Sequence, residues 1–424
     1  MGTEVFFVLF ENHIFTYFVC LFISVILHLY LIKKYTNGIT DPLFYNLIMT
    51  ILANTIPIFL YWTGNISSNA FIYILIAEFM YWTGFILLAK HSFSFSGKIL
   101  VDNHKALDYI FFLFLSIYIV FKIIIYTTVG IPAFMGSRLE MYREAVGLGV
   151  FERLISFPVF YVITYSFYLI DKKKFLYWAY FAFIVHVIFS LLSGSKSTVL
   201  LLVFGYFTYT YIYKGKIMTL KSIAKYIPFL IMMPIINLIL QSAALGWSEG
   251  FARLLMRFVA NGDVYYMSFP NNNIEYVKIK NKFTYYFSNI MWPLRLVDLK
   301  DLDTVVGFQL TWIVYPTIYG AGFGPNTRNP VLGWVLYHWG GVIFCFIQGL
   351  ITSFLMFRPA SILPKSLLTC IYAGYVYNLM LGFVTDSGLG MSSIFDVFLN
   401  TIILIVVYLF FNGPTIKLIS RKNS

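Results

Sequence analysis

The chain has 424 residues, of which 60% are hydrophobic and only 11% are charged, and its mean hydropathy is +0.79. This composition excludes a soluble globular domain and predicts a single all-α integral membrane domain over residues 1–424. The net charge of +12 does not indicate nucleic acid as a partner, because most of the basic residues lie in connections between long apolar runs.

The apolar runs predict eleven membrane-spanning helices in a polytopic bundle. In chain order they cover residues 14–32, 43–62, 70–89, 109–128, 154–170, 175–192, 199–213, 224–240, 331–354, 367–384 and 394–411. An odd number of spans places the two termini on opposite sides of the membrane. Residues 4–10 are also apolar and allow an additional half-span, which would raise the total to twelve.

The basic residues between these runs predict the orientation of the bundle. Alternate connections hold 15 lysines and 2 arginines: Lys33, Lys34, Lys90, Lys98, Lys105, Lys172, Lys173, Lys174, Lys214, Lys216, Lys221, Lys225, Arg358, Lys365, Lys417, Arg421 and Lys422. Positive charge is enriched in short cytoplasmic loops. We therefore expect these connections and the C-terminus to be cytoplasmic, and the N-terminus to be external.

Arginine is distributed differently from lysine. Seven of the nine arginines fall in the segments predicted to be external: Arg138, Arg143, Arg153, Arg253, Arg257, Arg295 and Arg328. A guanidinium group is a planar fork that binds phosphate or carboxylate through paired hydrogen bonds, whereas a lysine is a point charge. The bias indicates an anionic ligand at the outer face. The alternative is that these arginines contact lipid headgroups or pair with nearby glutamates.

The first external loop, residues 129–153, contains a short segment with helical spacing. Arg138, Tyr142 and Arg143 would lie on neighbouring parts of one surface, and Glu140 and Glu144 would form a second row. Such a surface is able to hold an anion together with a general base. A solvated helix that neutralises its own charges is the structural alternative.

A very short external turn, Ser193-Gly-Ser-Lys-Ser197, separates two later spans. Lys196 lies close to the start of the following helix, where free backbone N–H groups also favour anions. The same residues would serve equally well as a simple helix cap.

The long external loop, residues 246–330, is polar and rich in aromatic residues. Glu249, Arg253 and Arg257 recur every four residues, which predicts an amphipathic helix at the membrane surface. Downstream lie polar groups and rings suited to sugar faces or to a membrane interface: Asp263, Tyr265, Tyr266, Tyr285, Tyr286, Trp292 and Arg295. Residues 305–319 are apolar and short, and are expected to be either re-entrant or buried against the bundle. A glycine-rich turn then brings Arg328 to the mouth of the next span.

Several residues are candidates for a general base. His338 lies about two helical turns beyond Pro330, and histidine as a residue type suits proton acceptance near neutral pH, although a histidine between two aromatic residues often serves packing alone. Glu140, Glu144, Asp263 and Asp386 are the alternatives. Within the membrane, Glu78 and Lys122 are expected to face the interior of the bundle, as partners of each other.

Layout and short motifs together resemble a known family. A helical bundle with a long external loop late in the chain, the turn Ser-Gly-Ser195-Lys196-Ser, and Asn329-Pro330-Val-Leu-Gly333 followed by Gly340-Gly341 look like the bacterial O-antigen polymerases, often called Wzy proteins. The resemblance covers about a third of the chain. Family members commonly have Ser-Arg where this chain has Ser195-Lys196. The lysine keeps the positive charge but lacks the planar, forked guanidinium group.

The resemblance implies a glycosyltransferase of the membrane-embedded GT-C type that works without a metal or other cofactor. It would transfer a growing glycan from undecaprenyl diphosphate to the non-reducing end of a lipid-linked repeat unit, at the periplasmic face of the bacterial inner membrane. The diphosphate would be bound by Lys196, Arg253, Arg257 and Arg328, and Arg138, Arg143 and Arg295 would complete the substrate site. Besides the bilayer and the lipid-linked oligosaccharide, a chain-length regulator protein is an expected partner.

Two other functions remain as alternatives at this stage. A flippase for the same lipid-linked oligosaccharide would be expected to have two similar halves, an even number of spans and charges along a central cavity. An O-antigen ligase would use the same donor and a histidine in the general region of His338.

Overall fold

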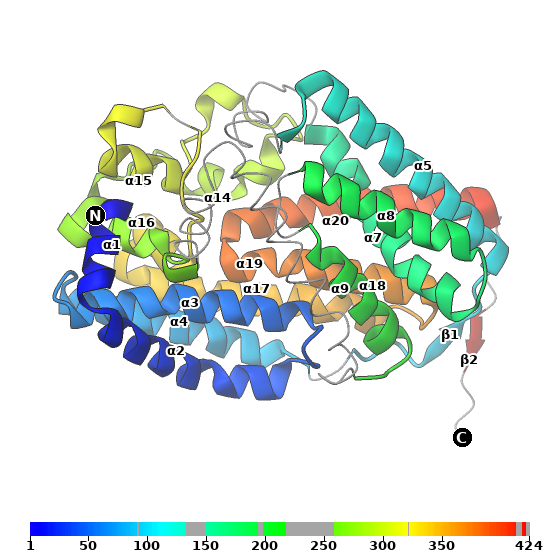
Figure 1. The fold of residues 1–424 in the computed structure, drawn as a ribbon, viewed down its shortest axis with the longest axis horizontal. Coiled ribbons are helices and arrows are strands. Elements are labelled where there is room, and N and C mark those ends of the chain that lie inside the picture. Colours follow the sequence, from blue (N-terminus) through cyan, green and yellow to red (C-terminus); the bar gives the residue numbers. More distant parts are fainter. Residues whose placement is uncertain are drawn as a thin grey trace.

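The structure, a computed structural model, describes residues 1–90, 93–132, 149–193, 198–217, 258–320, 322–412 and 418–420. Most of the described chain is helical, and the long helices run side by side along the long axis of the molecule (Figure 1). The all-α bundle predicted from composition is therefore confirmed.

Eight helical stretches in the described part of the chain are long and apolar enough to cross a membrane. They are α2 (Ile14–Tyr35), α3 (Pro42–Trp62), α4 (Ser68–Leu88), α5 (His104–Val129), α7 (Gly149–Asp171), α16 (Asn329–Tyr337) with α17 (Gly341–Ile362), α18 (Leu367–Met380) with α19 (Gly382–Thr385), and α20 (Ser387–Asn412). Two shorter apolar helices are α8 (Leu176–Leu192) and α9 (Leu200–Phe207), which continues as the π-helix η2 (Thr208–Tyr213). These helices confirm a multi-pass membrane protein. The predicted span at residues 224–240 lies outside the described residues.

Local sequence explains where several of these helices begin. Asp41 caps α3 by accepting a hydrogen bond from the backbone of Leu43, and Pro42 occupies the first position of that helix. Ser67 and Asn103 cap α4 and α5 in the same way. Ser366 forms a reciprocal capping box with Thr369 at the start of α18. Such caps satisfy backbone N–H groups that have no partner within the helix.

The apolar N-terminal stretch forms a separate short helix, α1 (Thr3–Asn12), which ends before α2 begins at Ile14. Ten residues of helix extend about 15 Å, which is too short to cross a bilayer. Phe6 is fully buried, and its ring stacks on that of Tyr266 at 4.5 Å between centroids. This helix therefore packs against the long loop.

The lysine-rich connections meet at one end of the bundle. The contacts between them are Tyr211 Oη to Asn37 Oδ1 (2.6 Å), Lys214 Nζ to Asp171 Oδ1 (2.6 Å), Leu100 N to Lys365 O (3.2 Å), and an ion pair between Lys174 and Asp108. At the same end, β1 (Lys98–Leu100) pairs antiparallel with β2 (Leu418–Ser420), opposite the end that holds α15 (Val306–Val314) and α16 (Figure 1). The lysine-rich connections thus lie together on one side of the bundle. The cytoplasmic location of that side stays a prediction.

The predicted span at residues 331–354 was wrong as a single helix. The chain forms α16, turns through η7 (His338–Gly340) and continues as α17. His338 has a φ of 49°, a backbone conformation that favours glycine. Gly333 in α16 lies directly against Gly341 in α17, and a Cβ on Gly341 would overlap the backbone of Gly333 and Tyr73 Oη. Two glycines therefore allow the short helix to fold back on the long one.

The long loop enters the bundle. Its described elements are α13 (Asp263–Ser268), η4 (Pro270–Tyr276), α14 (Lys282–Met291), η5 (Leu299–Asp301), α15 and η6 (Pro316–Ile318). Gly262, just before α13, packs directly on the backbone of Ala53 in the middle of α3, and Asn261 Nδ2 donates to Met49 O at 2.6 Å. Tyr265 and Tyr266 are fully buried. The segment of the loop that is buried in the bundle is therefore α13. The helix α15, which was expected to be re-entrant or buried, has one buried face and one accessible face.

Candidate functional site

Arg328 lies buried at the start of α16, with only 5% of its surface exposed. Its two neighbours fix its position. Asp386 Oδ2 accepts a hydrogen bond from Thr327 N at 2.6 Å, and Asn329 Nδ2 donates to Phe383 O at 2.8 Å. A short hydrogen bond also joins Ser387 to the amide of Asn329. The junction between α19 and α20 therefore holds the backbone on both sides of Arg328.

The guanidinium of Arg328 makes no hydrogen bond or ion pair with any described residue. Its charge acts at a distance on Tyr81, Tyr265 and Asp386. A buried cation without a bonded partner is costly, because the protein interior screens charge far less than water does. This arrangement suits an anion that arrives with the ligand.

Further hydrogen-bond donors lie beside Arg328. The first turn of a helix leaves backbone N–H groups without intrahelical partners, and in α16 these belong to Asn329 and Val331, since Pro330 has none. Thr327 is 2% exposed, and its hydroxyl has no hydrogen-bond partner in the described part of the protein. A guanidinium fork, a helix N-terminus and an unused hydroxyl thus occur within five consecutive residues. We call residues 327–331 the Arg328 site, and its donors are all suited to phosphate oxygens.

A line of polar side chains runs from α4 through α13 and α3 to α2. Tyr265 Oη donates to Glu78 Oε1 at 3.1 Å and lies 3.5 Å from Asn54 Oδ1. Asn54 Nδ2 is in turn 3.4 Å from His28 Nε2. These groups come from α13, α4, α3 and α2, so four separate segments bring them together. The sequence indicated that Glu78 faces inward with Lys122 as its partner, whereas the observed partner is Tyr265, which belongs to a loop predicted to be external.

Asp386 was a candidate base, and the structure surrounds its carboxylate with backbone donors. Oδ1 accepts from Gly388 N at 2.7 Å, and Oδ2 accepts from Thr327 N. Burial raises the pKa of Asp386, while these N–H groups and the charge of Arg328 oppose that rise. With both oxygens already accepting hydrogen bonds, Asp386 is placed to position Thr327 and Arg328.

The other described candidates lie on other elements of the fold. His338 is exposed at the far end of α16, ten residues after Arg328 and about 15 Å from it along the axis. Asp263 begins α13, and its carboxylate accepts from Val264 N at 3.0 Å. Arg295 is exposed in the turn after α14. The structure therefore brings together Arg328 and Asp386 from the predicted set.

Six predicted site residues lie outside the described residues: Arg138, Glu140, Arg143, Lys196, Arg253 and Arg257. The amphipathic helix predicted around Arg253 and the helical segment around Arg138 lie outside them as well. Their roles stay predictions.

Two other cations within the helical bundle have acidic partners. Lys122 Nζ lies 2.7 Å from Glu152 Oε1, so its partner is Glu152 and not Glu78 as expected. The reason is proximity, because Glu152 lies on α7, which packs beside α5. Arg153 forms an ion pair with Asp396 in α20 and lies over the ring of Phe395. Arg153 is therefore satisfied within the protein, in contrast to Arg328.

Comparison with known proteins found no matching protein family, no matching curated protein and no matching solved structure.

Proposed function

We propose that this chain is a membrane-embedded glycosyltransferase that polymerises lipid-linked oligosaccharide repeat units, as the sequence resemblance implies. The observation that carries the proposal is the buried Arg328, which has no bonded anion and has a helix N-terminus and a free hydroxyl beside it. The matching ligand group is the diphosphate of an undecaprenyl-linked donor. Catalysis would take place at the periplasmic face of the bacterial inner membrane.

In this proposal, the Arg328 site stabilises the leaving group. Negative charge grows on the diphosphate as the bond between the donor sugar and the phosphate oxygen breaks, so preorganised donors bind the transition state more tightly than the ground state. Arg328 would supply paired N–H groups, and Thr327 a hydroxyl donor. Asp386 would hold both residues in place through the backbone of Thr327.

The acceptor hydroxyl also needs a proton acceptor close to the anomeric carbon. His338 lies about 15 Å from Arg328 along α16, which is too far from a phosphate held by that residue. The Tyr265 hydroxyl donates to Glu78 at 3.1 Å, and the charge of Arg328 acts at a distance on the same tyrosine. We therefore assign proton acceptance to Glu78, and His338 becomes a candidate contact for sugars nearer the outer surface.

A flippase is the second candidate, and one observation favours it. Polar and charged side chains run through the bundle from His28 through Asn54 and Tyr265 to Glu78, and charges inside a membrane domain often line a transport path. An O-antigen ligase would use the same diphosphate chemistry at the Arg328 site.

Gene deletion and complementation distinguish these functions. Loss of a polymerase should leave surface polysaccharide with single repeat units, whereas loss of a flippase should remove surface repeats and loss of a ligase should leave polymer on its lipid carrier.

Complementation with Arg328→Ala should give no polymer, and Arg328→Lys should restore it only in part, because an ammonium group lacks the planar fork. Arg358→Ala, at an exposed arginine in a predicted lysine-rich connection, is the matched control and should restore chains of normal length. Normal chain growth with Arg328→Ala would contradict diphosphate binding at this site.

A further inference from the structure

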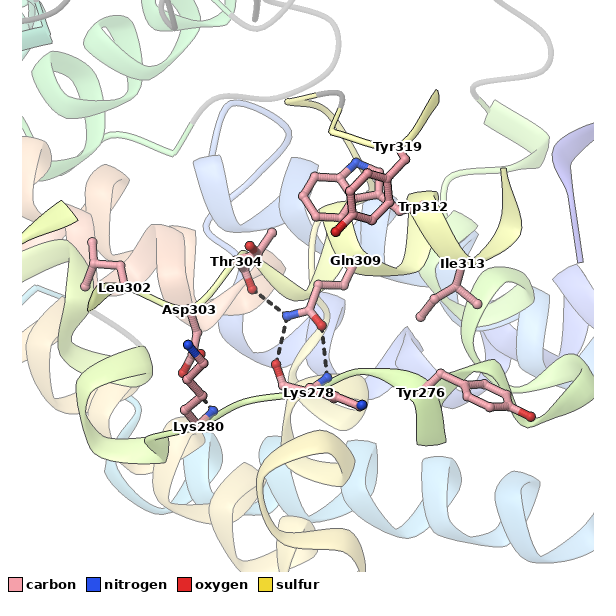
Figure 2. Close-up of a pocket in the computed structure, with 10 residues that line it drawn as sticks. All are labelled: Tyr276, Lys278, Lys280, Leu302, Asp303, Thr304, Gln309, Trp312, Ile313 and Tyr319. Carbon is pink, nitrogen blue, oxygen red and sulfur yellow. Dashed lines mark hydrogen bonds between the residues drawn. The ribbon is translucent and has the colours of Figure 1, made fainter. Parts of the chain in front are cut away.

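A cavity of about 360 Å³ lies at the surface of the long loop, between the segment that follows η4 and one face of α15. Figure 2 shows Trp312 and Tyr319 side by side on one wall, and Tyr276, Lys278 and Lys280 along the other. Its volume falls at the lower end of the range of about 300–1,000 Å³ that is common for small-molecule sites.

Hydrogen bonds within the protein hold the two walls together. Gln309 on α15 accepts from Lys278 N at 2.9 Å, and its amide donates to Lys278 O and to Thr304 O (Figure 2). Asp303 Oδ2 accepts from the backbone N–H groups of Lys280 and Asn281. The cavity is therefore preformed, which lowers the entropic cost of ligand binding.

The aromatic lining is arranged on the outward face of α15. Trp312 and Gln309 are three residues apart and share that face, while Leu310 and Thr311 are buried on the other. The rings of Trp312 and Tyr319 lie 4.8 Å apart and are tilted by 47°. Tyr319 is 77% exposed, so its ring is accessible from outside. Flat rings of this kind stack on the apolar faces of sugars.

The charged lining favours an acidic ligand. Lys278 and Lys280 form no ion pair with any described residue, and Asp303 is the one acidic side chain among the residues that line the cavity. The positive charge of the two lysines in the lining is larger than the negative charge of Asp303. The second oxygen of the Asp303 carboxylate remains available for a sugar hydroxyl. Rings, a carboxylate and two lysines within one concave site match a sugar that carries a carboxylate.

We propose that this cavity is a subsite for carbohydrate that contains acidic sugar residues, separate from the Arg328 site. A pyranose ring stacks on Trp312 and Tyr319, its hydroxyls face Asp303, and the carboxylate of the sugar interacts with Lys278 and Lys280. The inference rests on the proposed function only for the source of the carbohydrate, which would be the growing glycan. The competing explanation is that these rings and lysines anchor the loop in lipid headgroups.

Calorimetry on the full-length protein in lipid nanodiscs tests the subsite without any turnover. The probes are trigalacturonate, which is acidic, and maltotriose, which is neutral. We expect trigalacturonate to bind at least tenfold more tightly than maltotriose. Trp312→Ala should weaken both, and the double variant Lys278→Gln/Lys280→Gln should remove the preference for the acidic probe. Trp62→Ala and Lys300→Gln, exposed positions outside the cavity, are the matched controls and should bind like the wild type.

Two results would overturn the subsite. One is the absence of saturable trigalacturonate binding by the wild-type protein, or equal binding by the cavity variants and the controls. The other is quenching of the Trp312 fluorescence, measured as the difference between wild type and Trp312→Phe, by brominated phosphatidylcholine in the nanodiscs, because that would place the ring in lipid. Binding that persists while the gene deletion fails to affect polymer length would support the subsite and contradict the polymerase proposal.

Discussion

At the scale of single residues, the most informative groups are donors that the protein buries and does not use. Arg328 and Thr327 are adjacent, both are buried, and neither side chain has a bonded partner in the described part of the chain. By contrast, Lys122 and Arg153 are also partly buried and each has a carboxylate. An unused buried hydroxyl costs about 1–3 kcal/mol, so its retention is easiest to explain by a bound ligand.

Thr327→Val tests that explanation, because valine keeps the shape and removes the hydroxyl. The backbone N–H of Thr327, which donates to the Asp386 carboxylate, is unchanged. We expect the melting temperature in detergent to stay the same or to rise. Chain growth should fall at least about tenfold, as loss of a hydrogen bond to a charged ligand costs about 1.5–3 kcal/mol.

Thr311→Val is the control, since Thr311 is also buried but its hydroxyl donates to Gly307 O at 3.0 Å. It should lower stability slightly and leave chain growth intact, and the same pattern in both variants would refute a ligand role for Thr327.

At the scale of helices, the short α16 depends on close contact between Gly333 and Gly341. Its start at Arg328 is buried and its end at His338 is exposed, so the helix leads from the interior of the bundle to its surface. Tyr73 Oη donates to Pro330 O at 2.9 Å and also lies beside both glycines. The place where α16 meets α17 and α4 therefore sets the position of the Arg328 site.

Gly341→Ala should disrupt this junction. The added methyl group would overlap Gly333 and Tyr73 Oη, and relief requires α16 to move away from α17. Overpacking of this kind costs about 1–3 kcal/mol or more, which should appear as a lower melting temperature and reduced chain growth. Gly340→Ala is the neighbouring control, because its methyl group would approach only Tyr337 Cβ, at 3.3 Å, and its φ of −65° suits alanine. Comparable losses in both variants would show that the glycine contact does not position the site.

Hydropathy predicted where helices occur but not how they break or what enters between them. Residues 331–354 are mostly apolar, with His338 and Gln348 among the exceptions, so hydropathy predicts one span, and the break at His338 follows from the contact of two glycines in the folded chain. Likewise, α13 is polar and aromatic, which predicts an external position, yet Tyr265 is buried because Glu78 and Asn54 provide partners for its hydroxyl. The position of Arg328 near the start of a late helix was predictable from the glycine-rich turn and Pro330. Its burial was not, because that depends on α19 and α20 from further along the chain.

At the scale of the whole molecule, charge is divided between the two ends of the bundle. The lysine-rich connections and the β1–β2 pair lie at one end, and α15 and α16 lie at the other (Figure 1). Lysine, a strongly hydrated point charge, suits the cytoplasmic side, whereas a site for a lipid diphosphate needs forked donors at the opposite side. The polymerase proposal therefore requires a fixed orientation of the bundle in the membrane.

Cysteine labelling in intact cells tests that orientation. The three native cysteines, Cys20, Cys345 and Cys370, are fully buried, so background labelling by an impermeant maleimide should be low. We expect Lys300→Cys in the long loop to react in intact cells once the outer membrane admits the reagent. Lys172→Cys and Lys216→Cys, both exposed at the lysine-rich end, should react only after the inner membrane is permeabilised. Short basic loops stay on the cytoplasmic side, which is the physical reason for this order. The reverse pattern would place the Arg328 site on the cytoplasmic side, where a polymerase that acts in the periplasm has no access to its substrate.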